Sequence, residues 1–443
     1  MTTIASRPLG QIETSMALMH QLNGSTQTTS LLSVGGTLPT EIINQAAAAL
    51  HARHPLLHSR IEERADALHF CADVPFEHID VQCLPSRTGT TQNQLLQQQL
   101  DQVLDPSCQL WRLLVLSDAQ ATQHLLLLTC HHAIVDAVSL VQLLDEFLDD
   151  CERLCSGLTL QCDVEPLAEP LEAHLADASA PAPVCATPPA LPYLQTLALE
   201  QRTTGVSRLL LQRSLSNHLQ RIAVQQQLSL NSLLAGALLK SAEDIGCGPQ
   251  LRIGTAVSLR QRAARTISRS SIGCYIGVAH QCLNMADRTL LDLATDYQQQ
   301  LRASLPMQAL RQPDIGLSAR RQGIDRLRQQ QGFSQGIALT NHGNILFSPR
   351  QHLQVHDYVN VASRVAGNFA VAVHVTRFQG CLSLCFTFAK PLMSETQIHS
   401  LQRKLLRALL SLNPVSEVTP GSPLLSSWRK ASCTFSTAKV TAQ

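Results

Sequence analysis

A buried strand, a short polar loop and an amphipathic helix follow one another in the stretch Leu125–Ser139 (LLLLTCHHAIVDAVS) and just beyond it. Four leucines and Thr129 form an apolar run typical of a strand covered on both faces. After Asp136 the apolar residues recur at helical spacing: Val138, Val141, Leu144 and Phe147. The sequence therefore predicts a strand that ends in a loop carrying His131 and His132, and a helix that begins next to Asp136.

This loop has the residue types that general-base catalysis needs. Consecutive side chains on an extended segment point to opposite faces, so His131 and His132 are expected to have different roles. A neutral imidazole can take the proton of a hydroxyl or amine that attacks a carbonyl. Asp136 would shape the loop through backbone donors or by pairing with a distant cation. The same residues also fit an ordinary helix start, because Asp is a good N-cap.

The motif His131-His132-Ala-Ile-Val-Asp136 resembles the HHxxxD signature of the chloramphenicol-acetyltransferase-like superfamily. That superfamily includes nonribosomal-peptide condensation domains, plant acyltransferases and stand-alone acyltransferases of the phthiocerol dimycocerosyl transferase type. The order of elements from Leu228 to Arg260 resembles the stand-alone enzymes most closely, and the DFGWG motif of the plant branch is missing. Ala137 stands where the family pattern usually has Gly.

The resemblance implies roles for five residues. His132 would be the general base, and His131 a buried, structural member of the motif. Arg260, which follows the predicted strand Leu251–Val257, would pair with Asp136; alternatively it is a solvated member of the basic run that ends at Arg269. Asn341 stands where relatives carry a Ser-Asn-x-Gly element, and would donate to a substrate oxygen or shape a turn.

The resemblance also implies a fold. We expect an α/β (α+β) protein with two chloramphenicol-acetyltransferase-like lobes, mixed sheets flanked by helices, and an active-site tunnel between the lobes. Residues 1–156 would form the N-terminal lobe with the motif, and residues 194–415 the C-terminal lobe. The proline-rich stretch 157–193 would be the crossover linker. The Ser/Thr-rich residues 416–443 are predicted to be a disordered tail.

Local patterns predict several further elements. The helices and strands expected on this basis include a strand at Thr29–Val34, a helix at Pro39–His54, a helix at Gln92–Leu104, a hairpin from Leu110–Leu116 to His132, a helix beginning near Ser232, a strand at Ile337–Leu339 followed by a turn, a hairpin of Phe369–Val375 with Leu382–Phe388, and a helix at Ser394–Leu412.

Composition excludes some classes of protein. The net charge of +1 gives no general attraction to nucleic acid. The 14 cysteines are scattered without a CxxC pair, which indicates free thiols in a reducing compartment and no zinc site. The N-terminus does not resemble a signal peptide, and no stretch reaches the length of an apolar membrane span. A soluble, cytoplasmic monomer is therefore expected.

The functional expectation is an acyltransferase. It would move an acyl group from a thioester, on coenzyme A or on an acyl carrier protein in trans, to the hydroxyl or amine of a small-molecule, polyketide or lipid acceptor, in secondary metabolite or lipid biosynthesis. Ester formation is preferred over amide formation. No permanently bound cofactor and no metal are expected. A non-catalytic, condensation-like scaffold or binding protein and a thioester hydrolase remain as alternatives.

Overall fold

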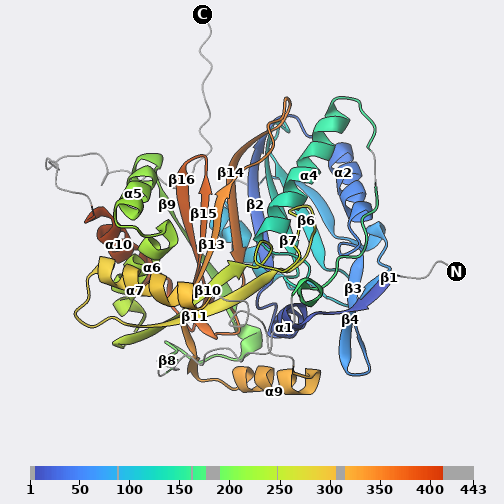
Figure 1. The fold of residues 1–443 in the computed structure, drawn as a ribbon. Coiled ribbons are helices and arrows are strands. Elements are labelled where there is room, and N and C mark those ends of the chain that lie inside the picture. The colour runs from blue at the N-terminus through green and yellow to red at the C-terminus, as the bar shows by residue number, and fades with distance from the viewer. Residues whose placement is uncertain are drawn as a thin grey trace, which may run out of the picture.

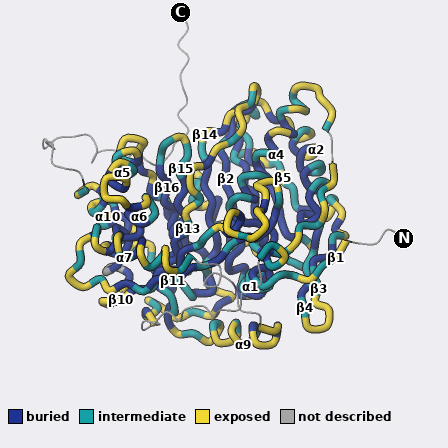
Figure 2. Tube along the Cα trace, viewed as in Figure 1, coloured by how far each residue is buried: buried dark blue, intermediate teal, exposed yellow. Residues whose placement is uncertain are grey.

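The computed structural model describes residues 5–86, 89–160, 163–175, 190–246, 248–305 and 315–412. Two large mixed sheets stand next to each other in the middle of the molecule, and helices cover their outer sides (Figure 1). The strands of the central sheets are mostly buried, whereas exposed residues gather in the outer helices and loops (Figure 2). The predicted fold, two α/β lobes with mixed sheets flanked by helices, is confirmed.

The N-terminal lobe is built on a five-stranded sheet. In sheet order its strands are β14 (Gln354–Ala362), β2 (Thr28–Gly35), β7 (Gln123–Cys130), β6 (Trp111–Ser117) and β5 (Val81–Pro85). The β5–β6 pair is parallel and the other pairs are antiparallel. Its helices are α1 (Gln11–His20), α2 (Thr40–Arg53), α3 (Gln92–Asp101) and α4 (Ala137–Cys155).

The C-terminal lobe is built on a six-stranded sheet. In sheet order its strands are β11 (Ile276–Asn284), β10 (Gln250–Ser258), β13 (Gln335–Ile345), β15 (Phe369–Phe378), β16 (Cys381–Lys390) and β9 (Thr203–Leu211). Parallel pairing joins β10 to β13 and β13 to β15. Its helices are α5 (Arg213–Gln225), α6 (Leu230–Ser241), α7 (Leu290–Ala303), α9 (Leu317–Arg328) and α10 (Glu395–Leu410).

Two small sheets complete the described strands. One consists of β1 (Ala5–Pro8), β4 (Ala67–Ala72) and β3 (Ser59–Arg64), and the other of β12 (Gly332–Phe333) and β8 (Leu191–Pro192). The described parts of the expected linker contain the short 3-10 helix Leu171–His174, and Leu171 is buried. The central part of that linker and the expected tail lie outside the described residues.

The strand β14 ties the lobes together. Residues 354–362 come from the C-terminal half of the chain, yet β14 pairs along its length with β2 of the N-terminal sheet. Val359 and Val361 of β14 pack in one cluster with Leu31, Leu127 and Cys385. The N-terminal sheet therefore includes a strand from residues 194–415, the region expected to form the C-terminal lobe. The sequence patterns did not predict this strand.

Most of the predicted elements are confirmed, with shifted ends. The hairpin that leads to the histidines is β6–β7, and the hairpin near the C-terminus is β15–β16. The turn expected directly after Leu339 is wrong, because β13 continues to Ile345 with a change of register between Asn341 and Asn344. In the described part of the chain, no helix has both the length and the apolarity needed to cross a membrane.

Candidate active site

The HHxxxD loop joins the end of β7 to the start of α4. β7 ends at Cys130, and the next backbone N–H, that of His131, donates to the carbonyl of Leu110 at 2.8 Å. α4 begins at Ala137 with Asp136 as its N-cap, and Asp136 Oδ1 accepts from the N–H of Ser139 at 2.8 Å. The helix packs through a strongly apolar face, which includes Leu140, Leu143 and Leu144. A buried strand and a buried helix therefore hold the loop at both ends.

His131 is buried inside the N-terminal lobe. None of its surface is exposed, and its Nδ1 accepts a hydrogen bond from the N–H of Ala133 at 3.1 Å. Its ring lies 4.4 Å, centroid to centroid, from the ring of His20. Burial lowers the pKa of His131 well below its usual range. The side chain is thus a neutral acceptor that braces the loop.

Asp136 and Arg260, which are far apart in sequence, form a buried ion pair. Arg260 Nε donates to Asp136 Oδ2 at 2.8 Å, and Nη2 donates to Asp136 Oδ1 at 3.0 Å. The exposed fractions of the two side chains are 4% for Arg260 and 2% for Asp136. This is the two-pronged geometry in which a guanidinium binds a carboxylate most strongly. Asp136 is therefore both a helix cap and an ion-pair partner, and Arg260 is not a solvated member of the basic run.

The remaining N–H groups of Arg260 are also used. Nη1 donates to the carbonyls of Ser268 and Ser271 at 2.6 and 2.9 Å, and Nη2 donates to Ser139 Oγ at 2.8 Å. The guanidinium also lies 4.8 Å above the ring of Tyr275. All five donors of the side chain are thus satisfied, a pattern that lysine cannot reproduce.

Ser139 joins the motif helix to the C-terminal half. Its Oγ donates to the carbonyl of Gly273 and accepts from the N–H of Gly273, both at 3.0 Å. A Cβ at position 273 would lie 2.6 Å from the ring of Tyr275, so this close approach requires glycine. Gly273 thus connects the segment before β11 to the motif helix.

Ala137, which replaces the usual glycine, fits its position. It is the first residue of α4 and is not among the residues with a positive φ angle. Glycine is required where the backbone adopts a left-handed conformation, and that condition does not apply here. The methyl group of Ala137 therefore strains no part of the loop backbone.

His132 faces the C-terminal half. Its Nδ1 lies 3.8 Å from the Sγ of Cys274, which belongs to the segment leading into β11. Burial lowers the pKa of His132, and the positive charge of Arg364 lowers it further. Its own carbonyl, the carbonyl of Val135 and the charge of Asp136 oppose this shift. The result is a partly buried imidazole held neutral, the form that accepts a proton.

Cys274 raises the question of a cysteine–histidine nucleophile. Burial raises the pKa of its thiol well above the usual range, and the carboxylate of Asp136 adds to this effect. A reactive cysteine needs a lowered pKa, so the geometry favours a thiol that packs against the imidazole and does not attack.

We expect Cys274→Ala to retain most of the turnover, because the thiolate is not formed in this environment. The measurement is steady-state turnover of an acyl thioester by the variant and the unaltered protein. A loss as deep as that of His132→Ala would assign Cys274 a chemical role.

Three further polar side chains from the C-terminal half gather around His132. His342 from β13 and His374 from β15 have ring centroids 6.1 Å apart; burial lowers the pKa of both, and the nearby His132 adds to this effect. Burial lowers the pKa of His342 to about 4. Arg364, in the loop after β14, is close enough to lower the pKa values of His132 and His374.

The sequence missed these three residues. His342 is the neighbour of Asn341, which the resemblance singled out instead. The alternation of Phe369–Val375 places His374 on the strand face opposite the valines. This alternation is the sequence pattern that could have marked His374 as a candidate site residue. No local pattern marks Arg364.

Asn341 lies away from the histidines. It is exposed, its Oδ1 accepts from the N–H of Gly343 at 2.9 Å, and its Nδ2 donates to Asn231 at 3.3 Å. Gly343 has a φ angle of +75°, which glycine adopts without strain. Asn341 therefore shapes the irregular part of β13 from which His342 projects.

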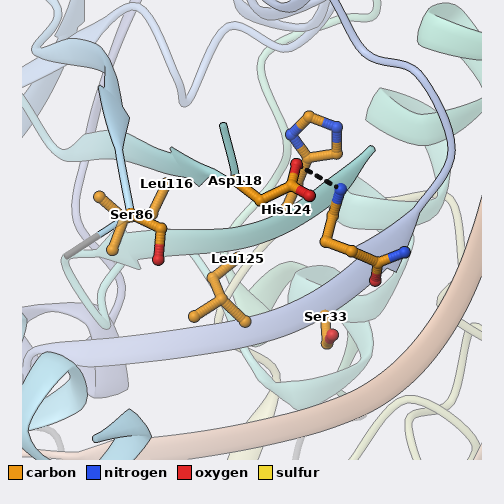
Figure 3. A pocket seen from close by; sticks show the side chains of 7 residues that line it. Ser33, Ser86, Leu116, Asp118, His124 and Leu125 are labelled. Carbon is orange, nitrogen blue, oxygen red and sulfur yellow. Dashed lines mark hydrogen bonds between the residues drawn. The ribbon is translucent and has the colours of Figure 1, made fainter. Parts of the chain in front are cut away.

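A surface pocket near the start of β7 is separate from this site. Ser33, Ser86, Asp118, His124 and Leu125 are among its lining residues (Figure 3). The pocket and the two histidines lie at opposite ends of β7, a strand of eight residues. The tunnel expected between the lobes stays a prediction. Within the described residues, no group of three His, Cys, Asp or Glu side chains is placed to hold a metal ion.

Comparisons with protein families match both halves of the chain. Residues 15–166 match the condensation-domain model, and residues 200–392 match the model described as "Phthiocerol/phthiodiolone dimycocerosyl transferase C-terminus". The first match includes the HHxxxD loop, and the second includes Arg260 and the three polar residues around His132. A comparison with curated proteins finds no match.

Solved structures share the fold over almost the whole chain. Polyketide synthase associated protein 5 from Mycobacterium tuberculosis has a TM-score of 0.66 at 18% identity, and the match covers 92% of this chain and 98% of that one. The first condensation domain of the CDA synthetase has a TM-score of 0.68 at 14% identity, covering 93% and 97%. A trichothecene 15-O-acetyltransferase from Fusarium sporotrichioides has a TM-score of 0.72 at 11% identity, covering 92% and 94%.

Proposed function

Because the chain belongs to the chloramphenicol-acetyltransferase-like superfamily, which includes condensation domains and phthiocerol dimycocerosyl transferase-type enzymes, we propose that it is an acyltransferase. It moves an acyl group from a thioester of coenzyme A or of a carrier protein to the hydroxyl of a small-molecule, polyketide or lipid acceptor. The observation that carries the proposal is the neutral His132 ring, which faces the other half of the molecule beside a loop fixed by the Asp136–Arg260 pair.

The proposed chemistry needs one proton carrier, His132. The imidazole takes the proton of the acceptor hydroxyl as its oxygen attacks the thioester carbon. The carbon–sulfur bond of the resulting tetrahedral species then breaks, and the proton passes to the leaving thiolate. No covalent intermediate with the protein is needed, which agrees with the high pKa of Cys274. Asp136 and Arg260 act as positioning residues, because their hydrogen bonds are spent on each other and on the loop.

The pH dependence of activity follows from the lowered pKa of His132. A base works only when neutral, and the pKa of His132 lies below 6.5 because of burial and the charge of Arg364. Activity should therefore persist as the pH falls through 6.5 and decline only at lower pH. The groups around the ring are His131, Asp136, Cys274, His342, Arg364 and His374.

The check is kcat/KM measured over about pH 5 to 8, with melting temperature followed in parallel to exclude unfolding. An acid limb centred above 6.5 would contradict the assignment of His132 as the free base.

The experiment that tests the function measures thiol release from acyl-coenzyme A by the purified full chain. Donors of increasing acyl length are combined with alcohols and amines, and ester or amide products are identified by mass spectrometry. Acceptor-dependent thiol release with an ester product is expected. Release that does not depend on an acceptor would identify a hydrolase, and no release with coenzyme A or carrier-bound donors would indicate a non-catalytic protein.

A further inference from the structure

Arg364 is a partly buried arginine without an ionic partner among the described residues. Its Nε is shielded from solvent and has no hydrogen-bond partner among the described residues. None of its other guanidinium nitrogens makes a hydrogen bond or an ion pair within the described ranges either. Its guanidinium carbon lies 6.0 Å from the ring centroid of Phe369, which is the outer limit of a cation–π interaction.

Within the described ranges, no opposite charge compensates Arg364. Burial lowers its pKa to about 10, and no carboxylate acts in the opposite direction. The nearby titratable side chains are His132 and His374, both of which its positive charge helps to keep neutral. A charge that is removed from water lowers the stability of the folded state unless an opposite charge compensates it. The unpaired guanidinium of Arg364 is therefore available to bind an anion from outside the chain.

The backbone fixes Arg364 at the candidate active site. It lies two residues after β14, and the N–H of Ala362, the last residue of β14, donates to His374 Nε2 at 3.3 Å. His374 is in turn next to His342, whose two ring nitrogens are buried and have no partner in the described part of the chain. Unsatisfied hydrogen-bonding groups thus cluster beside His132, where a polar ligand would satisfy them.

We propose that Arg364 binds a carboxylate of a substrate, so that this acyltransferase acts on a carboxylate-bearing molecule. The carboxylate belongs to a hydroxy acid acceptor or to a dicarboxylic acyl donor. A guanidinium suits this role because its planar fork binds a carboxylate through two parallel hydrogen bonds. The inference rests on the proposed function for the reaction, but the binding of a carboxylate can be measured without turnover.

Two other anions are less suitable. The phosphate of a pantetheine donor is held far from its thioester sulfur by the pantetheine arm, whereas Arg364 lies beside the reacting centre. The oxyanion of the tetrahedral species is the second candidate. If Arg364 stabilised that oxyanion, it would accelerate the reaction of every substrate equally. If it recognised a substrate carboxylate, it would favour only substrates that carry one. A comparison of charged and neutral substrates therefore separates the two roles.

The first experiment measures binding through melting temperature with acetate as the probe and acetamide as its neutral counterpart. Acetate should raise the melting temperature of the full chain in a concentration-dependent way, and acetamide should not, because only a ligand that binds the folded state stabilises it. Arg364→Met should abolish the acetate effect, and Arg364→Lys should keep part of it.

The buried arginine Arg350 provides the matched control. It pairs with Asp145 and Asp149 at 2.6 and 2.7 Å, so Arg350→Met leaves two carboxylates without their partner and should lower the melting temperature. Arg364→Met removes an unpaired charge and should leave the melting temperature unchanged or raise it. A marked fall for Arg364→Met would assign Arg364 to the structure and overturn the proposal, as would equal stabilisation by acetate and acetamide.

The second experiment identifies which substrate carries the carboxylate. One arm compares a hydroxy acid with its primary amide as acceptor, and the other compares succinyl- with butyryl-coenzyme A as donor. Arg364→Met should reduce kcat/KM roughly 10- to 100-fold more for the carboxylate member of one arm than for its neutral counterpart. Equal losses for charged and neutral substrates, or no loss in either arm, would overturn substrate recognition. Acetate binding without any turnover would instead refute the proposed function.

Discussion

Replacement of His132 by Ala is expected to lower turnover by about 10² to 10⁴-fold, the range typical of a lost general base. The ring is the neutral imidazole that faces the C-terminal half, and the residue is less buried than His131. Donor binding and melting temperature should remain close to those of the unaltered protein. The measurement is steady-state thiol release together with the dissociation constant of the acyl thioester.

His131 supplies the control for this prediction. Its ring is fully buried and accepts from the N–H of Ala133, so His131→Ala should act through stability and lower the melting temperature. His131→Asn should restore part of that stability, because the amide oxygen can take over the role of Nδ1 as acceptor. Equal, purely kinetic losses from changes at His131 and His132 would contradict the division of roles.

The features that the sequence predicted well are local ones. The apolar run before His131 and the helical spacing after Asp136 both follow from burial, and burial is visible in a single stretch of chain. The β6–β7 hairpin brings strands together that are neighbours in sequence. The pairing of Asp136 with Arg260 came from the resemblance, since no pattern in the sequence measures a contact between residues so distant along the chain.

The features that the sequence did not predict depend on long-range packing. β14 joins the N-terminal sheet through β2, more than 300 positions earlier, and its own pattern does not say which sheet it enters. β13 continues past Leu339 and changes register between Asn341 and Asn344, and such irregularities leave a weak trace in sequence. Arg364 is notable because it has no ionic partner among the described residues, and only the three-dimensional structure can show this.

The largest stability effect is expected at the Asp136–Arg260 pair. Removal of either partner leaves the other charge buried and uncompensated, so Asp136→Ala and Arg260→Ala should each lower the free energy of unfolding by roughly 3–5 kcal/mol and reduce turnover with it. Arg260→Ala should be the more severe change, because it also frees the carbonyls of Ser268 and Ser271. Arg260→Lys should recover only part of the loss, since an ammonium cannot reproduce the five-donor pattern.

A double-mutant cycle separates this pair from ordinary destabilisation. The double variant should be less impaired than the sum of the single ones, because its second change removes the orphaned charge. Arg60 and Asp73 form a matched control pair with similar two-pronged geometry, at 2.9 and 3.0 Å, but with exposed fractions of 31% and 23%. Their coupling energy should be only about 0.2–1 kcal/mol, as for solvent-exposed pairs. Urea unfolding of the four variants in each cycle gives both coupling energies. If the losses at Asp136 and Arg260 were strictly additive, the ion pair would not hold the loop, and Asp136 would act through its cap on α4 alone.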